Sequence, residues 1–558
     1  MNIICLFCCG LCNNAGMSAV IPILSPTQMD AFNAIERTNS NLLILGPAGT
    51  GKSTFINYLK SASAKRIICA CPTAVSALNV GGQTIHSLFQ IQPRDFIMPE
   101  LLKLKAKPRN ILNATDVLII DEISMVAPDL LDAIDILARY ARKNNEPFGG
   151  IQVVAIGDLF QLPPVITRDA TQYYSDEYGH ANSYFFDSHV YSRANFIKYN
   201  FDTVYRQNDT DLLNSLIRLR QNNTDALPFF NSCRIDDDAR RQNAVVITPF
   251  RAVADRINAT RLAQITDTPV TYNGVLSGNF SERDVPAPLE LTLKVGALVV
   301  FVKNGDKWHN GSMGIVRSMS SREIIVQLLS DGRETVSVKP EKWQKIEYSR
   351  DENDRLIENE VGGYKQFPLN LGYAMTIHKA QGKTLDTVVV DVSRGCFAHG
   401  QAYVALSRTR RASDMHIASP LSIRDVIFDK RVLDFVNDLK KSPKRGIFYR
   451  LCCCKMFVIS AIRFSFFFTV SIFISVKSSQ NILFIWLFNC RFSCIRLSVF
   501  ARSACFSFSS TIFRTWVITT FIFSARLRAC SPALNSCSSC CISFLYDKIS
   551  AHVSAASL

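Results

Sequence analysis

The 558-residue sequence predicts an α/β protein built on parallel sheets, and three observations lead to this fold class. Short apolar runs alternate with helical stretches from residue 17 to about 200, and the alternation resumes from 201 to 445. Strands of parallel sheets are almost continuously apolar, because helices cover both of their faces. A glycine-rich turn at 46–53 joins an apolar run to a helical one, an arrangement typical of phosphate binding. These patterns predict two α/β lobes.

The expected strands and helices follow from the positions of the apolar residues. Four short runs in the first half predict buried strands, at Leu42–Leu45, Arg66–Ala70, Val117–Ile120 and Ile151–Ile156. The stretch Pro128–Ala141 predicts a helix whose apolar face consists of Leu130, Ile134, Leu137 and Ala141. In the second half we expect strands at Ala244–Ile247 and Thr387–Val392. Residues at about 291–365 are rich in Val, Gly and turn residues, which predicts a small β-barrel inserted in the second lobe.

The net charge of +15 does not by itself indicate a nucleic-acid partner, because it is concentrated near one end. Residues 446–558 contain eleven Lys or Arg and one acid, a charge of +10, which leaves +5 for the rest. Fourteen of the eighteen Cys lie there or in the uncharged first sixteen residues. The other four are too scattered for a disulfide framework, as is typical of a reducing compartment, and they are Cys69, Cys71, Cys233 and Cys396.

The strongest motif is Gly46-Pro-Ala-Gly-Thr-Gly-Lys-Ser53, between an expected strand and the helical run Thr54–Leu59. Its glycines allow successive backbone N–H groups to face phosphate oxygens at the positive end of the following helix. Lys52 can reach the β and γ phosphates of ATP, and the Ser53 hydroxyl can bind Mg²⁺. We therefore expect ATP and Mg²⁺ at the residues Gly46, Pro47, Ala48, Gly49, Thr50, Gly51, Lys52, Ser53 and Thr54.

Two adjacent carboxylates, Asp121 and Glu122, follow the expected strand Val117–Ile120. A buried strand that ends here delivers Asp121 to the edge of the phosphate site, where its carboxylate can hold Mg²⁺. Glu122 is then positioned as the general base for the attacking water. Gln161 follows the next strand, in Gly157-Asp-Leu-Phe-Gln-Leu-Pro-Pro164, and its uncharged amide can sense the γ-phosphate. Taken alone, that segment is equally consistent with an ordinary Pro-terminated loop.

These motifs resemble those of the petite-integration-frequency (PIF-type) DNA helicases, relatives of RecD in superfamily one. The signature stretch is matched by Asp121-Glu-Ile-Ser-Met125, Pro147-Phe-Gly-Gly-Ile-Gln152 and residues 157–165. The remaining motifs occur in the family's order, as Leu24-Ser-Pro-Thr-Gln28, Pro72-Thr-Ala74, Gly82-Gln-Thr-Ile-His-Ser87, Val204-Tyr-Arg-Gln207, Thr376-Ile-His-Lys-Ala-Gln-Gly382 and Tyr403-Val-Ala-Leu-Ser-Arg408. The resemblance spans about residues 20–420.

The resemblance implies two RecA-like P-loop NTPase lobes with an SH3-like barrel inserted in the second. The implied domains are a Cys-rich leader at 1–16, a first lobe at 17–200 with a short duplex-splitting wedge at 92–110, a second lobe at 201–290 and 366–445, the barrel at 291–365, and an anomalous tail at 446–558. The wedge carries the basic residues Arg94, Lys103, Lys105, Lys107 and Arg109, which suit phosphate contact as well as they suit a solvated linker.

The resemblance also implies roles for single residues. Arg206 and Arg408 would be arginine fingers of the second lobe, and guanidinium groups suit this role because they neutralise charge on the γ-phosphate oxygens. The implied catalytic set is Lys52, Asp121, Glu122, Gln161, Arg206 and Arg408, with Ser53 and Asp121 as Mg²⁺ ligands. Gln28 would read the adenine, and Gly382 would contact the nucleotide. Candidate DNA contacts are Thr73, His86, Thr376 and His378, which could equally be ordinary polar loop residues.

The implied function is an ATP-dependent DNA helicase that moves 5′ to 3′ on single-stranded DNA, in repair, recombination, replication or telomere maintenance. Expected partners are single-stranded and forked DNA, together with replication or repair proteins. We expect an intracellular location: the cytoplasm for a bacterial or viral protein, the nucleus or mitochondrion for a eukaryotic one. Two alternatives stay open. One is an RNA or mixed-substrate helicase, because no motif selects a 2′-hydroxyl. The other is a membrane-tethered ATPase switch, with 457–476 as the tether.

The two ends are expected not to belong to the working enzyme, which would begin at Met17. Residues after 446 hold seventeen of the 37 Phe without a strand or helix period, as when a Lys/Glu-rich gene is read on the wrong strand. A membrane anchor is the rival interpretation, since Met456–Val476 could span a bilayer, although Arg463 opposes insertion. The pairs Cys5-x₂-Cys8 and Cys9-x₂-Cys12 abut, so we expect no zinc site there.

Overall fold

The first lobe contains a six-stranded parallel sheet in the order β3-β2-β4-β5-β1-β6. The computed structural model describes residues 24–329, 332–351, 353 and 355–441. The strands of this sheet are β1 (Leu42–Leu45), β2 (Ile67–Cys71), β3 (Gln83–Thr84), β4 (Val117–Ile120), β5 (Gln152–Gly157) and β6 (Ile197–Asn200). The four strands predicted from apolar runs are confirmed, with β2 and β5 displaced by one residue.

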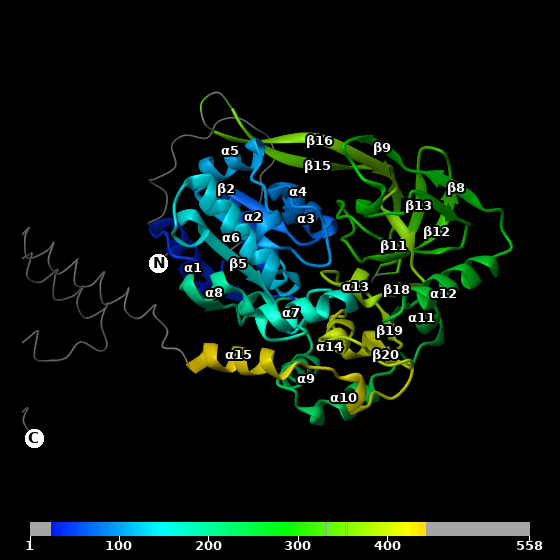
Figure 1. Ribbon diagram of the computed structural model, residues 1–558. Coiled ribbons are helices and arrows are strands. Elements are labelled where there is room, and N and C mark those ends of the chain that lie inside the picture. Colours follow the sequence, from blue (N-terminus) through cyan, green and yellow to red (C-terminus); the bar gives the residue numbers. More distant parts are fainter. Residues whose placement is uncertain (1–23, 330–331, 352, 354, 442–558) are drawn as a thin grey trace, which may run out of the picture. The chain divides into compact units, whose positions relative to one another are not determined.

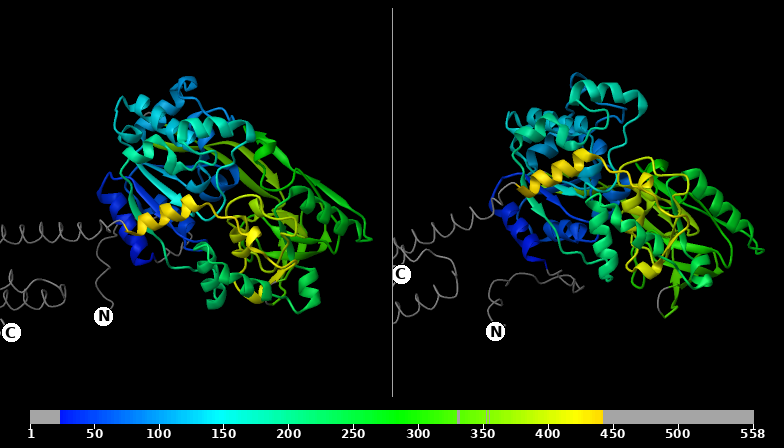
Figure 2. Two further views of the ribbon diagram at one scale, coloured as in Figure 1. Left: turned by 60° about the horizontal axis from the view of Figure 1, so that its bottom comes forward. Right: turned by 90° about the horizontal axis from the view of Figure 1, so that it is seen from below.

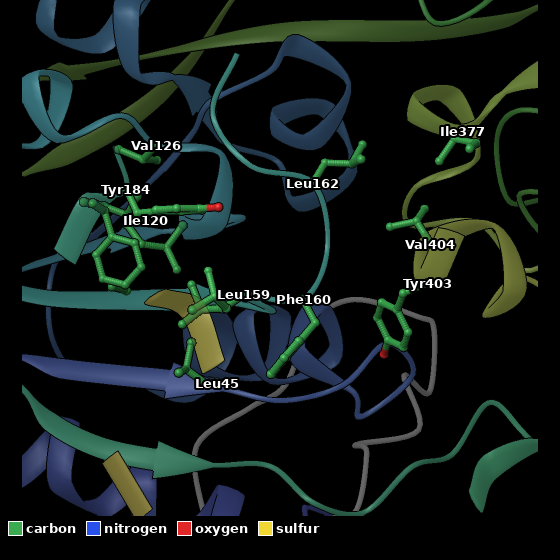
Figure 3. Close-up of a cluster of buried hydrophobic side chains, with 14 of the residues drawn as sticks. Leu45, Ile120, Val126, Leu159, Phe160, Leu162, Tyr184, Ile377, Tyr403 and Val404 are labelled. Atoms are coloured by element: carbon green, nitrogen blue, oxygen red, sulfur yellow. The ribbon is translucent and has the colours of Figure 1, made fainter. Parts of the chain in front are cut away.

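Helices cover both faces of this sheet, as a parallel sheet requires. Successive residues of one strand enter different cores: Leu42 and Ile44 pack with Phe55 of α2, whereas Leu43 and Leu45 pack on the other side. Figure 3 shows part of the core that contains Leu43 and Leu45, where Leu45 lies near Phe160. The helices of the lobe are α1 (Pro26–Arg37), α2 (Lys52–Ala62), α3 (Ala74–Val80), α4 (Ile85–Phe89), α5 (Ala106–Ala114), α6 (Pro128–Arg142), α7 (Thr171–Tyr178) and α8 (His189–Arg193).

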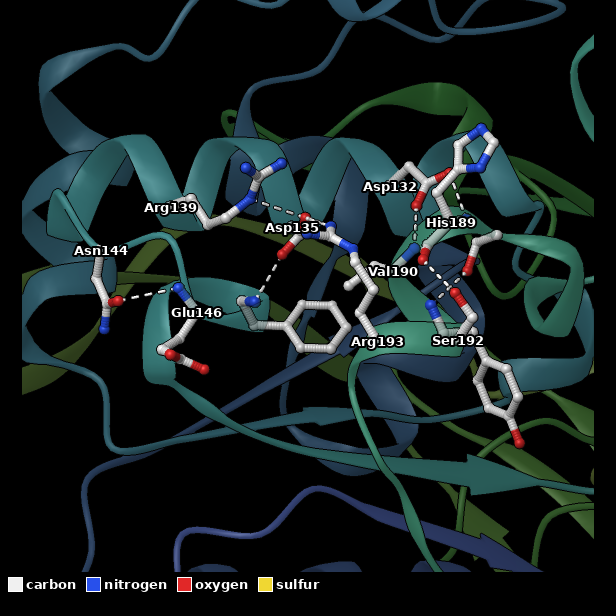
Figure 4. A network of polar contacts seen from close by, with 12 residues as sticks. Asp132, Asp135, Arg139, Asn144, Glu146, His189, Val190, Ser192 and Arg193 are labelled. Atoms are coloured by element: carbon white, nitrogen blue, oxygen red, sulfur yellow. Dashed lines mark hydrogen bonds and ion pairs between the residues drawn. The ribbon is translucent and has the colours of Figure 1, made fainter.

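Helix α6 is buried on more than the predicted apolar face, because two of its carboxylates are hydrogen-bonded inside the lobe (Figure 4). Asp135 accepts from the guanidinium groups of Arg139 and Arg193, each at 2.9 Å. Asp132 accepts from the backbone N–H of Val190 at 2.8 Å. Buried charges are tolerated when they are paired and hydrogen-bonded, and this network fixes α6 against α8.

The second lobe contains a four-stranded parallel sheet in the order β18-β7-β19-β20. Its strands are β7 (Val245–Thr248), β18 (Ala374–Thr376), β19 (Val388–Val390) and β20 (Met415–Ile417). Its helices are α9 (Thr210–Arg220), α10 (Leu227–Ser232), α11 (Asp238–Gln242), α12 (Arg251–Ala263), α13 (Ile377–Ala380), α14 (Gln401–Leu406) and α15 (Lys430–Lys441). Helix α15 returns to the first lobe (Figure 2). There Phe435 stacks on Phe186 with ring centroids 4.3 Å apart.

An antiparallel insert separates β7 from β18 and is longer than the predicted 291–365. Its strands are β8 (Val270–Asn273), β9 (Val275–Gly278), β10 (Glu290–Leu293), β11 (Leu298–Phe301), β12 (Met313–Met319), β13 (Ile324–Leu328), β14 (Thr335–Val338), β15 (Glu341–Arg350), β16 (Leu356–Gln366) and β17 (Leu369–Leu371). β8 escaped prediction because three of its four residues are exposed, which leaves no apolar run. The five-stranded sheet β14-β13-β12-β11-β17 shares a core with the pair β10-β8, and its SH3-like character stays a prediction.

The hairpin of β15 and β16 extends from the insert to the first lobe, beside α5 (Figure 1). Tyr348 of β15 is 1% exposed there, and its hydroxyl accepts a hydrogen bond from the backbone N–H of Cys69 at 3.1 Å. The backbone N–H of Tyr348 donates to the Gln83 side chain at 3.2 Å. Lys107 and Glu347 form an ion pair at the same contact. The insert is therefore anchored on both lobes.

No helix within the described ranges is long and apolar enough to cross a membrane. The expected span at 456–476, the Cys pairs of the leader and the whole tail lie outside the described residues.

Candidate nucleotide-binding site

A cavity of about 670 Å³ lies between the carboxyl end of the first lobe's sheet and the second lobe. The predicted site residues that line it are Gln28, Ala48, Gly49, Gly51, Lys52, Ser53, Thr54, Glu122, Gln161, Arg206, Gly382 and Arg408. Four other predicted residues are not part of this lining, namely Gly46, Pro47, Thr50 and Asp121. The lining also includes residues that the sequence did not single out, namely Leu24, Tyr205, Asn208, Thr384 and Arg410.

The loop between β1 and α2 requires glycine at two positions for steric reasons. Gly49 and Gly51 have φ of 82° and 76°, in the left-handed region that side chains disfavour. A Cβ on Gly49 would lie 2.4 Å from Cβ of Arg206, so the loop and that arginine are in close contact. The Lys52 ammonium donates to the carbonyls of Gly46 and Pro47 at 3.0 and 2.8 Å. Burial lowers the pKa of Lys52, whereas Asp158 and Glu122 favour its charged form.

Asp121 and Glu122 meet this loop at the end of β4. Burial, and then the charge of Glu122, raise the pKa of Asp121 to about 7. Burial also raises the pKa of Glu122. Glu122 has φ 50°, a left-handed conformation that costs a non-glycine residue on the order of 1–3 kcal/mol. Strain and perturbed pKa values at one residue are typical of functional sites.

The second lobe contributes two arginines, and Arg206 belongs to the connection between β6 and α9. The neighbouring Tyr205 N–H donates to the Gly49 carbonyl at 2.8 Å, which fixes this connection on the phosphate loop. The Arg206 guanidinium donates to the Gly382 carbonyl at 3.4 Å, and its buried Nη1 has no hydrogen-bond partner within the part of the chain that the structure describes. Burial lowers the pKa of Arg206.

Arg408 directly follows α14 and Ser407, and it is fully buried. Its guanidinium donates to the carbonyls of Val404, Ala380 and Lys383 at 2.6, 3.1 and 3.2 Å. Burial, and then the charge of Arg206, lower the pKa of Arg408 to about 9. Backbone carbonyls therefore set the direction of this guanidinium at the cavity wall.

Two glutamines of the first lobe have defined partners. Gln28 closes the capping box of α1, and its Nε2 donates to the Thr50 carbonyl at 3.2 Å. Gln161 Nε2 donates to Asp158 at 3.2 Å. Asp158 is fully buried and pairs with Arg220 at 2.8 Å. Asp158 was not among the predicted site residues, although a charged residue directly after an apolar strand, inside the motif at 157–164, was a usable signal.

The predicted Mg²⁺ ligands are Ser53, exposed near the start of α2, and Asp121, buried at the end of β4. Hydroxyl and carboxylate oxygens are the donors that Mg²⁺ prefers, so the donor chemistry at this end of the sheet fits the ion. Clusters of three or more His, Cys, Asp or Glu that could hold a metal are absent from the described ranges. Fewer ligands are needed here, because Mg²⁺ in nucleotide sites is bound through one or two protein groups and phosphate.

The four candidate DNA contacts lie outside this cavity. Thr73 caps α3 and Thr376 caps α13, each through a hydroxyl that accepts a backbone N–H. His86 lies in α4 and is half-buried, and His378 lies exposed in α13. Thr73 follows β2 and Thr376 ends β18, so each lobe presents one such pair at the carboxyl end of its sheet. Their contact with DNA stays a prediction.

Comparison with known proteins identifies relatives of the whole described region. Residues 23–212 match the family described as PIF1-like helicase. The ATP-dependent DNA helicase Pif1 of Bdellovibrio bacteriovorus is 30% identical over 441 residues, which cover 76% of this chain and 94% of that protein. The human ATP-dependent DNA helicase PIF1 is 31% identical, over 75% of this chain and 65% of the human protein.

Solved structures of Pif1 proteins are also similar to this chain. Pif1 from a Bacteroides species in complex with ADP-AlF4 has a TM-score of 0.70 and 34% identity, over 76% of this chain and 98% of that one. Bacteroides Pif1 bound to single-stranded DNA has a TM-score of 0.55 at the same identity and coverage. With a relative 30% identical over 76% of this chain and 94% of its own length, the chain belongs to the PIF1-like helicase family.

Proposed function

We propose that this chain is an ATP-dependent DNA helicase that moves 5′ to 3′ along single-stranded DNA and separates forked duplexes. The observation that carries the proposal is the convergence of the phosphate loop, Glu122, Arg206 and Arg408 on one cavity. A phosphoryl-transfer site needs these parts: a phosphate cradle, a base for the attacking water, and positive groups for the developing charge. Relatives named ATP-dependent DNA helicase Pif1, and a relative bound to single-stranded DNA, support DNA as the substrate.

In this proposal each lobe supplies part of the hydrolytic machinery. Lys52 and the loop N–H groups bind the β and γ phosphates, and Ser53 and Asp121 hold Mg²⁺. Glu122 takes the proton of the attacking water, with Gln161 beside the γ-phosphate. Arg206 and Arg408 neutralise charge that develops in the transition state. Mg²⁺, when bound, neutralises phosphate charge further. Because the arginines belong to segments after the first lobe, hydrolysis depends on how the lobes close.

DNA is proposed to contact Thr73 and His86 on the first lobe and Thr376 and His378 on the second. Contacts of this kind reach the phosphate backbone and position the strand without reading sequence. ATP-dependent closure then moves the two pairs relative to each other, which moves the strand.

The segment 92–110 is proposed to split the duplex. Two contacts hold this segment in the first lobe. Phe96 stacks on Tyr173 with ring centroids 4.4 Å apart, and the Ile97 N–H donates to Asp129 at 2.7 Å. In the same segment Met98 and Leu101 are exposed, with exposed fractions of 40% and 54%. A segment that is held at Phe96 and Ile97 and exposes apolar side chains suits contact with the first base pair of a fork, because nucleobases stack on apolar surfaces.

Unwinding of labelled forked DNA with Mg²⁺ and ATP tests the proposal. We expect strand separation from a duplex with a 5′ single-stranded overhang and little from the matched 3′ overhang. Preferential unwinding of the duplex with the 3′ overhang would contradict the proposed direction of movement. Equal unwinding of a matched RNA fork would favour the RNA or mixed-substrate alternative.

A further inference from the structure

The loop of the insert between β11 and β12 packs against the segment that follows α13. The Asn310 side-chain oxygen accepts a hydrogen bond from the Lys383 ammonium at 2.7 Å. A Cβ on Gly311 would lie 2.1 Å from the Thr384 carbonyl, so only glycine allows this approach. The backbone N–H of Met313 donates to Asp386 at 3.1 Å. Three successive contacts therefore fix this loop on residues 383–386.

The segment 380–386 faces the nucleotide cavity on its other side. Gly382 and Thr384 line the cavity. The carbonyls of Ala380 and Lys383 accept from the Arg408 guanidinium at 3.1 and 3.2 Å. The Leu385 N–H donates to the Arg408 carbonyl at 3.0 Å. One short backbone segment thus connects the insert's loop to a buried arginine of the proposed hydrolytic site.

We infer that Asn310 is a positioning residue for hydrolysis: by holding the Lys383 ammonium, it fixes the backbone carbonyls that orient Arg408. This inference rests on the proposed function. It makes the antiparallel insert part of the ATPase, although no residue of the insert lines the nucleotide cavity.

The charge of Lys383 explains why a partner is needed. Burial, and then the nearby charge of Lys379, lower the pKa of Lys383 to about 8. An ammonium that loses its acceptor in such a place moves towards water, and its own backbone moves with it. Removing the ammonium breaks the same contact, so the loss of Lys383 and the loss of Asn310 should act through a single step.

A double-mutant cycle tests the inference, with steady-state ATP hydrolysis on saturating single-stranded DNA as the measurement. Asn310→Ala should lower kcat by about tenfold and leave the KM for ATP within about twofold, because only the transition state needs Arg408 in place. Lys383→Met breaks the same hydrogen bond and should lower kcat to a similar extent, and Asn310→Ala combined with Lys383→Met should lower it no further than either change alone. Asn310→Asp, which keeps the acceptor, should retain wild-type kcat.

Lys307→Ala is the matched control, since Lys307 lies on the same loop but pairs with Glu334 inside the insert. Its kcat and KM should equal those of the wild type. Wild-type kcat in Asn310→Ala would overturn the inference, as would a double variant whose loss of kcat is the product of the two single losses. If Asn310→Ala fails to fold, a slow Asn310→Asp variant would overturn it equally. A wild-type protein without DNA-stimulated hydrolysis would instead contradict the proposed function.

Discussion

Gln381 of the second lobe donates a hydrogen bond from Nε2 to Oε2 of Glu122 in the first lobe, at 3.3 Å. Gln381 ends α13 and Glu122 follows β4, so the two lobes touch at the proposed general base. Burial raises the pKa of Glu122, and the hydrogen bond from Gln381 opposes that rise. The proton affinity of the base therefore depends on the placement of the second lobe.

Gln381→Ala should change the pH dependence of hydrolysis. A base acts only when it is deprotonated, so activity falls as the pH falls through its pKa. Without Gln381 the pKa of Glu122 is higher, and the acid limb of kcat/KM for ATP should move to higher pH. A profile measured between about pH 5.5 and 9 checks this, with Gln264→Ala on the exposed end of α12 as the control. A profile that superimposes on the wild type would show that the contact does not tune the base.

Glu122→Gln should preserve ATP binding and remove nearly all hydrolysis, because it deletes the base and leaves the phosphate loop intact. General bases contribute roughly 10²–10⁴-fold to the rate. Equilibrium binding of a fluorescent ATP analogue and steady-state turnover measure the two effects separately. Lys52→Ala is the contrasting variant and should weaken both. Turnover above about a tenth of wild type in Glu122→Gln would exclude this role.

Arg408→Ala should abolish DNA-stimulated hydrolysis while single-strand binding survives, since the guanidinium acts on the phosphate and not on DNA. The arginine is also fully buried among backbone carbonyls, so its loss leaves acceptors unpaired. Arg408→Met fills the volume better and separates loss of chemistry from loss of packing. Thermal unfolding and fluorescence anisotropy with labelled single strands check both points. Normal hydrolysis on saturating DNA in a folded Arg408→Met protein would refute the assignment.

A shortened protein running from Met17 to Arg445 should retain full ATPase and unwinding activity. The residues that line the nucleotide cavity, the candidate DNA contacts and the insert all lie within 24–441. Hydrolysis rates per molecule of the shortened and complete chains give the comparison. Loss of activity on truncation, with stable membrane association of the complete chain, would make the tail a functional element.

The fold was predictable from the sequence where a single requirement, such as burial on both faces or a positive φ, determines the residue types. The strand from 42 to 45 is buried on both sides, so its four apolar residues predicted β1 with the bounds that the structure shows. The phosphate loop was predictable because glycine is nearly the only residue that tolerates the φ of 82° at Gly49. β6 has only part-buried and exposed residues, and nothing in its pattern distinguished it from a loop.

Contacts between distant segments could not be predicted from one sequence. Gln381 lies inside a recognised motif, but its partner Glu122 is 259 residues away and no local pattern links them. Tyr205 stands in its motif only as the neighbour of Arg206, whereas in the structure its backbone N–H donates to the Gly49 carbonyl of the phosphate loop. Asn310 and Lys383 are ordinary surface types, and only the fold brings an amide to a part-buried ammonium.

The docking of Tyr348 limits how far the molecule can open. The insert is covalently joined to the second lobe at both of its ends, yet this tyrosine is buried in the first. Withdrawing it would expose a large ring and leave the Cys69 N–H without its acceptor, at a cost of several kcal/mol, on the order of 3–5. Bending the hairpin costs less free energy than withdrawing Tyr348. A bend is favoured between Lys345 and Ile346, because the pairing of β15 with β16 shifts register there. When the cleft opens, we therefore expect the hairpin to bend at this shift while Tyr348 stays buried in the first lobe.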